Sequence, residues 1–163
     1  MITSPPTDLV DLKSLLPEEL RTLVRQLGQD EYRAGQLLSW IHGKGVEEMD
    51  QMSNLSRAFR EQLKGGAWVS RLREVERQVS PGGQAIKFLF ELPTLERVES
   101  VLIIDGKRRT ACLSSQVGCP LDCQFCATGR MGFLRNLSAA QITDQLLQMS
   151  QVLLAERGER VTN

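Results

Sequence analysis

Residues 112–129 of the chain read CLSSQVGCPLDCQFCATG, and all four cysteines lie in this stretch. Three of them, Cys119, Cys123 and Cys126, have the spacing CxxxCxxC. Three thiolates on one loop can bind three irons of a cubane [4Fe–4S] cluster, which leaves the fourth iron open to a small-molecule cofactor. The sequence therefore predicts a metal-binding loop, because cysteines this close together do not form the framework of a secreted fold.

Zinc is the alternative ligand for these thiols. A structural zinc site needs four ligands, usually from two CxxC pairs, and only Cys123 and Cys126 have that spacing, although Cys112 could supply a fourth thiolate. We favour the cluster because a three-cysteine loop between a strand and a helix is a specific context. The single histidine, His42, lies in a helical region and is interpreted as a helix residue, not a ligand.

The first part of the chain has the apolar periodicity of three short amphipathic helices. The first helix begins at Pro17 and ends at Gly28. The second has Asp30 as its cap, and the third runs from near Ser53 to Gly66. The side chains expected to point inward are Leu20, Leu23, Val24, Leu27, Tyr32, Leu37, Leu38, Ile41, Leu55, Phe59 and Leu63.

After Gly66 the pattern changes to the two-residue alternation of β-strands. We expect strands at residues 67–78, 85–92, 98–104 and 109–114. Residues 101–104 are a continuous apolar run, which is typical of a strand that is buried on both faces.

A long helix is expected after the cysteine loop. Ser138 and Gln141 form a capping box, and Gly158 ends the helix. Its inward residues are expected to be Ile142, Leu146, Met149 and Leu153. Strand, loop and helix in this order form half of a βαβ unit, and the returning parallel strand is expected to begin at residues 160–163.

The composition is that of a soluble globular protein, with 41% hydrophobic and 25% charged residues. The 20 Lys and Arg residues balance the 20 Asp and Glu residues, so the total charge does not indicate a nucleic-acid partner. No run approaches the ~18 apolar residues of a membrane span, and the first residues lack the pattern of a signal peptide. We therefore expect a cytoplasmic protein that does not cross a membrane.

The cysteine stretch closely resembles the RlmN/Cfr family of radical S-adenosylmethionine enzymes, which methylate adenine in 23S ribosomal RNA. The CxxxCxxC spacing is typical of the whole superfamily, whereas CLSSQVGC at residues 112–119 is specific to this family. The resemblance covers nearly the whole chain, and its other matching segments are residues 32–36, 52–56, 97–101 and 135–138.

The resemblance implies an α/β fold in two parts. Residues 1–66 would form an N-terminal helical accessory domain. Residues 67–163 would form a β-rich segment followed by the start of an incomplete radical SAM (β/α) barrel. The three cysteines of the CxxxCxxC loop would hold a [4Fe–4S] cluster whose open iron binds S-adenosylmethionine, and Phe125 would pack near this cofactor or cover the cluster from water.

In the family, a methyl group is first placed on a C-terminal cysteine and is then added, as a radical, to C2 of adenine. By resemblance, Glu99 accepts the ring proton, and Cys112 forms a transient disulfide with the methyl-carrying cysteine. Without the resemblance, Glu99 would be read as a solvated strand carboxylate, and Cys112 equally well as an inert buried thiol.

The resemblance also implies the partners. The substrate would be 23S rRNA, with tRNA as a second substrate in some members, and a flavodoxin-type protein would supply electrons to a monomeric enzyme. The branch of the family that methylates C8 is the alternative for the target carbon.

Neither the Gly-Glu-Pro segment of the family nor its methyl-carrying cysteine has a counterpart in the 163 residues. We therefore expect an N-terminal portion that cannot complete methyl transfer alone, and the second hypothesis is a non-catalytic RNA-binding module. RNA contact is expected through basic residues near the end of the helical part, although a mixed solvated surface explains them too. These residues are Arg57, Arg60, Lys64, Arg71, Arg73 and Arg77.

Overall fold

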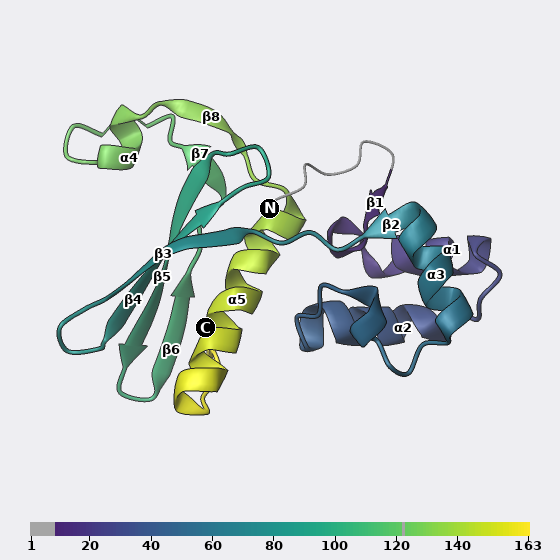
Figure 1. The fold of residues 1–163 in the computed structure, drawn as a ribbon. Coiled ribbons are helices and arrows are strands. Elements are labelled where there is room, and N and C mark those ends of the chain that lie inside the picture. Colours follow the sequence, from purple (N-terminus) through teal and green to yellow (C-terminus); the bar gives the residue numbers. More distant parts are fainter. Residues whose placement is uncertain (1–8, 122) are drawn as a thin grey trace. The chain divides into compact units, whose positions relative to one another are not determined.

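The computed structural model describes residues 9–121 and 123–163 of the chain. They fall into two compact units, one ending at Arg71 and one beginning at Leu72 (Figure 1). Each unit is described by itself below. No helix in the described ranges is long and apolar enough to cross a membrane.

The unit that ends at Arg71 is built from three α-helices, which are α1 (Pro17–Gln26), α2 (Tyr32–Leu38) and α3 (Arg57–Gly66). Three shorter helical turns complete it, η1 (Leu12–Ser14), the π-helical η2 (Ser39–Gly43) and η3 (Met49–Gln51). Strand β1 (Val10–Asp11) pairs in parallel with β2 (Ala67–Trp68), so the two ends of the unit are joined by backbone hydrogen bonds.

The predicted helical bundle is confirmed, with three local differences. The residue at the cap of α2 is Glu31 and not the predicted Asp30, and its side chain makes no capping hydrogen bond. Tyr32, expected to point inward, is 57% exposed at the start of α2. The third helix begins at Arg57 and not near Ser53, because the Ser56 hydroxyl accepts the Phe59 N–H at 3.2 Å and caps the helix there. The core contains most of the predicted apolar residues, including Leu20, Val24, Leu37, Ile41, Phe59 and Leu63.

The unit that begins at Leu72 contains a four-stranded antiparallel sheet. Its strands follow chain order and are β3 (Arg73–Val79), β4 (Ala85–Glu91), β5 (Arg97–Asp105) and β6 (Arg108–Cys112). The helix α5 (Ala139–Arg157) lies along one face of this sheet (Figure 1). The predicted first strand, residues 67–78, is in fact two strands, β2 and β3, that belong to different units.

The sheet is buried on one face only. Phe88 and Phe90 of β4 and Leu102 of β5 are fully buried and belong to the same core as Met149 of α5. Ile103, the next residue in β5, is 42% exposed. The prediction that residues 101–104 are buried on both faces is therefore wrong, because a second covering layer is absent from the described residues.

The predicted apolar face of α5 is only partly correct. Met149 and Leu153 are buried as expected, whereas Ile142 and Leu146 are only half-buried. The remaining buried positions of the helix are mainly polar and are occupied by Asp144, Gln145 and Gln148. The helix begins with the predicted capping box of Ser138 and Gln141, and Gly158 ends it in a left-handed conformation.

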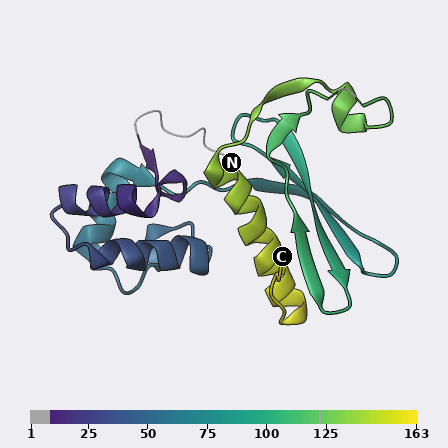
Figure 2. The ribbon, with the colours of Figure 1, turned by 180° about the vertical axis from the view of Figure 1, so that it is seen from behind.

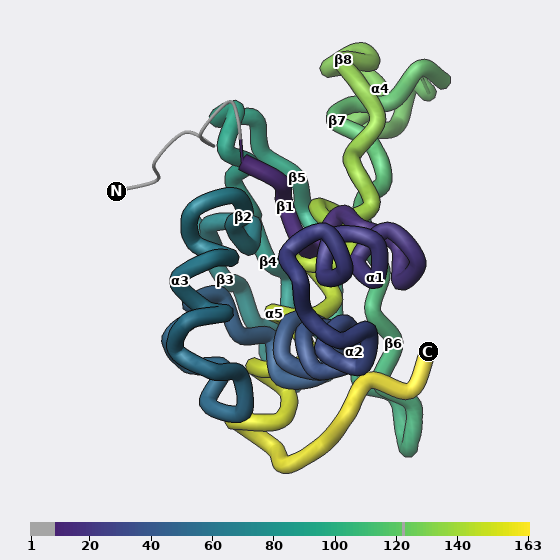
Figure 3. Tube along the Cα trace, turned by 90° about the vertical axis from the view of Figure 1, so that its right-hand side faces the viewer, coloured from purple at the N-terminus to yellow at the C-terminus, as the bar shows by residue number. Residues whose placement is uncertain are grey.

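Residues at the C-terminal end lie beside β6, as Figure 3 shows. The Asn163 N–H donates to the Arg109 carbonyl at 3.4 Å, and the Asn163 carbonyl accepts the Ala111 N–H at 2.9 Å. These two bonds flank Thr110 in the pattern of a parallel pair. The Thr162 N–H also donates to the Arg109 carbonyl, at 2.8 Å, and residues 159–163 are not assigned to a strand, so the returning strand itself stays a prediction.

A small ribbon carries the cysteine segment beyond the sheet (Figure 2). It consists of β7 (Gln116–Gly118) and β8 (Phe133–Asn136), which pair antiparallel, with the short helix α4 (Ala127–Arg130) between them. Gly118 has φ +74°, and a Cβ atom at this position would overlap the carbonyl oxygen of Gly132. The entry to the cysteine loop therefore requires glycine for both its dihedral angle and its close backbone approach.

We predict that Gly118→Ala destabilises this unit much more than Gly158→Ala does. Gly158 has a similar φ of +68°, but nothing lies within 4 Å of its Cβ position, so its replacement costs roughly 1–2 kcal/mol for the dihedral angle alone. Gly118→Ala should cost more free energy than this, because its Cβ atom would also overlap the Gly132 carbonyl oxygen. Denaturant unfolding monitored by circular dichroism measures both, and equal losses would contradict the role of the close approach.

Arg135 of β8 connects the ribbon to the β4–β5 turn. Its Nε donates to Glu96 at 2.9 Å, and its other nitrogens donate to Thr94 at 3.0 Å and to Gln141 of the capping box at 3.2 Å. Hydrogen bonds from Arg135 lower the pKa of Glu96 from 4.5 to about 2. The guanidinium thus holds together three segments that are distant in sequence.

The Glu96 carboxylate is predicted to stabilise the fold fully above pH ~4.5 and to lose this contribution as the pH falls toward ~2, because its pKa is lower in the folded state. Glu96→Gln should lower the free energy of unfolding by about 1–2 kcal/mol at pH 7 and should flatten the pH profile in that window. Arg135→Met should flatten it in the same way. An unchanged slope in both variants would refute the assignment.

Candidate functional site

The three cysteines of the predicted metal loop lie between β7 and α4. Cys119 follows β7 directly, and its N–H donates to the Gly132 carbonyl at 3.1 Å. The Cys126 N–H donates to the Cys123 carbonyl at 3.0 Å, and Cys126 is the cap residue of α4. All three thiols are free and partly exposed, as a metal or cluster that enters from solvent requires.

The thiols are not gathered into a metal site. In the ranges 9–121 and 123–163, no three side chains of His, Cys, Asp or Glu lie close enough to hold a metal ion. Neither the three-thiolate cluster site nor a zinc site completed by Cys112 is therefore preassembled. The donor set itself, three reduced and accessible thiols on one loop, has the chemistry that an iron–sulfur cluster requires.

Apolar side chains on the same loop and on β8 face solvent. Phe125, which precedes the last cysteine, is 93% exposed. Exposed apolar residues in such a concentration are unusual for a surface without a ligand or partner. The others are Leu121, Met131, Phe133 and Leu134.

Glu99 and Cys112, the two predicted catalytic residues, lie on the same face of the sheet. Cys112 is paired with Val101, and in a strand residues two apart point to the same face, so Glu99 shares the face of Val101 and Cys112. This face is opposite to the one that packs against α5, because Leu102 and Ser100 point to the core. Cys112 is exposed, so the interpretation as a buried thiol is wrong.

A shallow hollow surrounds the Glu99 carboxylate. One of its oxygens lies 3.0 Å from the Lys87 ammonium on β4. The hollow has a volume of about 80 Å³, and its lining residues are Glu76, Gln78, Lys87, Leu89 and Glu99. Glu99 is therefore an accessible carboxylate next to a cation, with space for a small group beside it.

The buried polar residues of α5 were not identified from the sequence. Asp144 accepts the Leu72 N–H at 2.7 Å, and the Gln148 amide donates to the Leu72 carbonyl at 2.8 Å. Gln145 bonds in the same way to the backbone of Ser114, between Cys112 and the cysteine loop. Polar residues at positions 144, 145 and 148, within an otherwise amphipathic helix, were the available signal.

The basic residues expected to contact RNA are divided between the two units. Arg60, Lys64 and Arg71 belong to the helical unit, whereas Arg73 and Arg77 belong to the other. Most are engaged in ion pairs within their units, with the pairs Lys64–Asp50, Arg71–Glu47, Arg73–Glu91 and Arg77–Glu74. Their positive charge is therefore largely compensated locally.

His42 lies in η2, as the helical interpretation predicts. Burial is the main cause that lowers its pKa, and the nearby Lys13 charge adds to the effect. Among the described residues, no metal-ligating group of three includes this imidazole.

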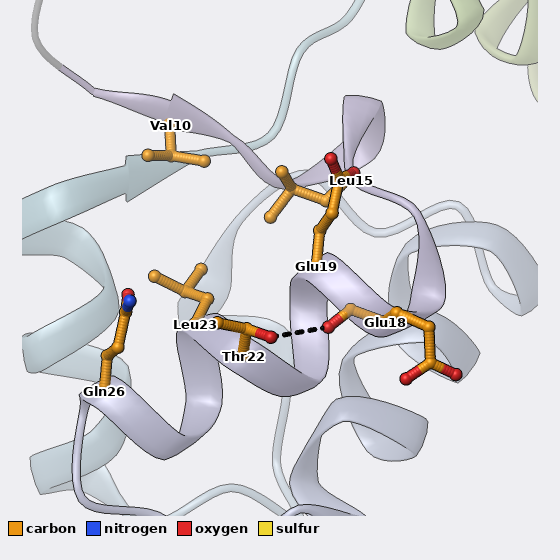
Figure 4. A pocket seen from close by; sticks show the side chains of 7 residues that line it. All are labelled: Val10, Leu15, Glu18, Glu19, Thr22, Leu23 and Gln26. Atoms are coloured by element: carbon orange, nitrogen blue, oxygen red, sulfur yellow. Dashed lines mark hydrogen bonds between the residues drawn. The ribbon is translucent and has the colours of Figure 1, made fainter.

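A pocket of about 370 Å³ opens beside α1 in the helical unit (Figure 4). Its only hydroxyl side chain, Thr22, donates to the Glu18 carbonyl at 3.0 Å. None of the seven lining residues is a Cys or a His, so the pocket offers no thiolate or imidazole for the predicted chemistry. They are Val10, Leu15, Glu18, Glu19, Thr22, Leu23 and Gln26.

Comparison with known proteins identifies relatives over nearly the whole chain. Residues 8–69 match the family described as the ribosomal RNA large subunit methyltransferase N-terminal domain. The chain is 43% identical over 162 residues to a probable dual-specificity RNA methyltransferase RlmN of Salinibacter ruber, covering 96% of this chain and 44% of the relative. A relative with the same description from Moorella thermoacetica is 44% identical over 161 residues, which are 96% of this chain and 46% of that protein.

The fold has a counterpart among solved structures. The crystal structure of a radical SAM methyltransferase from Sphaerobacter thermophilus matches with a TM-score of 0.85 and 32% identity, over 94% of this chain and 45% of that one. The chain thus spans less than half the length of the proteins it matches. In sequence and in fold, the chain is therefore similar to part of the RlmN RNA methyltransferases and to part of a radical SAM methyltransferase.

Proposed function

We propose that this chain contributes to methylation of adenine C2 in 23S rRNA, and of tRNA as a second substrate, through a methyl-cysteine intermediate. The observation that carries the proposal is the placement of Glu99 and Cys112 on one open face of the sheet, whose edge strand β6 leads into the three-cysteine loop. A base and an exchangeable thiol on the same accessible face can both reach one bound nucleotide.

In this proposal Cys119, Cys123 and Cys126 hold a [4Fe–4S] cluster. A cluster held there would bind S-adenosylmethionine at its open iron and would supply the electron that cleaves the sulfonium. Phe125 then covers this cofactor, which would explain why its ring is 93% exposed in the chain alone. A flavodoxin-type protein is the proposed electron donor, and the enzyme is proposed to act as a cytoplasmic monomer.

The chain's own residues perform the later steps. Glu99 accepts the proton that leaves C2, and the Lys87 ammonium lies 3.0 Å from one of its carboxylate oxygens. Cys112, which is exposed and lies outside the cluster loop, attacks the sulfur of the methyl-carrying cysteine after Glu99 has taken the ring proton. The S–S bond forms as the bond between that sulfur and the transferred carbon breaks, and this carbon keeps the electron pair and takes up a proton to become the methyl group of the product. The thiolate of Cys112 is the nucleophile in that exchange.

Anaerobic iron–sulfur reconstitution tests the proposal. We expect a brown protein with about four irons, whose electron paramagnetic resonance signal after reduction shifts when S-adenosylmethionine is added. Cys119→Ser should lose the cluster, whereas Cys112→Ser should keep it, because Cys112 is not one of the proposed ligands.

Two results would overturn this proposal. One is a colourless protein that binds zinc, and the other is a cluster that depends on Cys112 in place of Cys119. Either result would favour a binding module without radical chemistry.

A further inference from the structure

Gln145 of α5 is fully buried, and every polar atom of its side chain is hydrogen-bonded. Its Oε1 accepts the Ser114 N–H at 2.9 Å and the Ser100 hydroxyl at 2.6 Å. Its Nε2 donates to the Ser114 carbonyl at 3.0 Å and to the Gln141 carbonyl at 3.1 Å. Because the Ser114 peptide needs an acceptor on one side and a donor on the other, the orientation of the amide is fixed by its partners.

Ser114 lies between Cys112 at the end of β6 and Cys119 at the start of the metal loop, so its position affects both cysteines. Its hydroxyl donates to the Glu99 carbonyl at 2.6 Å. Ser100, the other partner of Gln145, directly follows Glu99 in β5. The Gln145 side chain is therefore bonded to both segments that carry the predicted catalytic residues.

The segment after Ser114 is also held by backbone bonds. The Leu137 N–H donates to the Ser115 carbonyl at 2.8 Å, and β7 then pairs with β8. The hydrogen bonds from Gln145 to Ser114 come before these bonds along the chain. Gln145 lies near the middle of the long helix α5, which is a rigid support. A buried amide with four bonds cannot rotate without leaving several polar groups unsatisfied.

We propose that Gln145 is a positioning residue for the proposed methyl-transfer site. Its amide fixes the Ser114 peptide, and thereby fixes the position of Cys112 and Glu99 relative to the start of the cysteine loop. The effect of Gln145 on methyl transfer rests on the proposed function. Its effect on the position of the Ser114 backbone does not, because that backbone belongs to this chain alone.

Gln145→Leu tests the inference, and Gln148→Leu is the matched control. Both glutamines are buried in α5 and bond to a backbone carbonyl, but Gln148 bonds to Leu72 and not to Ser114. Amide hydrogen exchange should be roughly tenfold faster or more at Ser114 and Cys119 in Gln145→Leu, after correction for global stability, and unchanged there in Gln148→Leu. Equal changes in both variants would show a general packing role and overturn the inference.

A milder variant covers the case in which Gln145→Leu does not fold. Gln145→Glu keeps acceptors for the Ser114 N–H and the Ser100 hydroxyl but loses the donor to the Ser114 carbonyl. It should also accelerate exchange at Ser114 and Cys119, by a smaller factor. Wild-type exchange at both positions in this variant would contradict the inference.

A spectroscopic comparison separates this inference from the proposed function. In reconstituted protein, the signal shift caused by S-adenosylmethionine should be broadened or lost in Gln145→Leu and retained in Gln148→Leu. An identical shift in both variants would overturn the positioning role. Since the exchange measurement needs no cluster, a wild-type chain that builds none counts against the proposed function alone.

Discussion

The second unit depends on hydrogen bonds from buried side chains of α5 to two backbone peptides. Asp144 and Gln148 satisfy both polar groups of Leu72, directly before β3, and Gln145 satisfies both polar groups of Ser114, shortly after β6. Since β3 and β6 are the two edge strands, one helix fixes the chain where it enters and where it leaves the sheet. Burial of polar side chains is favourable here because each one replaces water around a peptide that would otherwise lack a partner.

This arrangement determines which face of the sheet is accessible. The apolar side chains of β4 and β5 point toward α5, so the alternating residues point to the opposite face. Glu99 and Cys112 are on that uncovered face as a direct result of strand register. The same edge strand, β6, also accepts the backbone of Asn163 in the parallel pattern. The open face of the sheet and the edge that Asn163 contacts therefore meet at β6, the strand that leads to the cysteines.

Local signals in the sequence predicted most elements of the fold. Pro17 and the capping box at Ser138 gave two helix starts, because capping depends only on neighbouring residues. The exposure of Ile103 could not be predicted, since the apolar pattern of a strand does not say whether a second layer covers it. The hydrogen bonds of Gln145 could not be predicted either, because its backbone partner Ser114 is 31 residues away in sequence.

In the candidate site too, some features could be predicted from the sequence and others could not. The family resemblance supplied Glu99, Cys112 and the loop cysteines by position, but the common face of Glu99 and Cys112 follows only from the pairing of β5 with β6. The sequence spacing of the three cysteines does not determine whether their thiols lie close together. In the described residues they do not form a metal site. Sequence spacing specifies which donors are available, whereas their geometry depends on how the loop folds.

The start of the cysteine loop is held by hydrogen bonds, whereas its thiols are not gathered, and this difference affects how a cluster would bind. The entry is held at Ser114, at Ser115 and by the β7–β8 pairing, whereas the thiols beyond Gly118 are accessible and ungathered. Metal binding supplies folding free energy when a site forms only around its metal. In the proposed function, Cys119, Cys123 and Cys126 would hold the cluster on a loop whose entry is fixed at Ser114. Phe125, which is 93% exposed, would lose its contact with water if it covered the cofactor, and this burial would add to the same free energy.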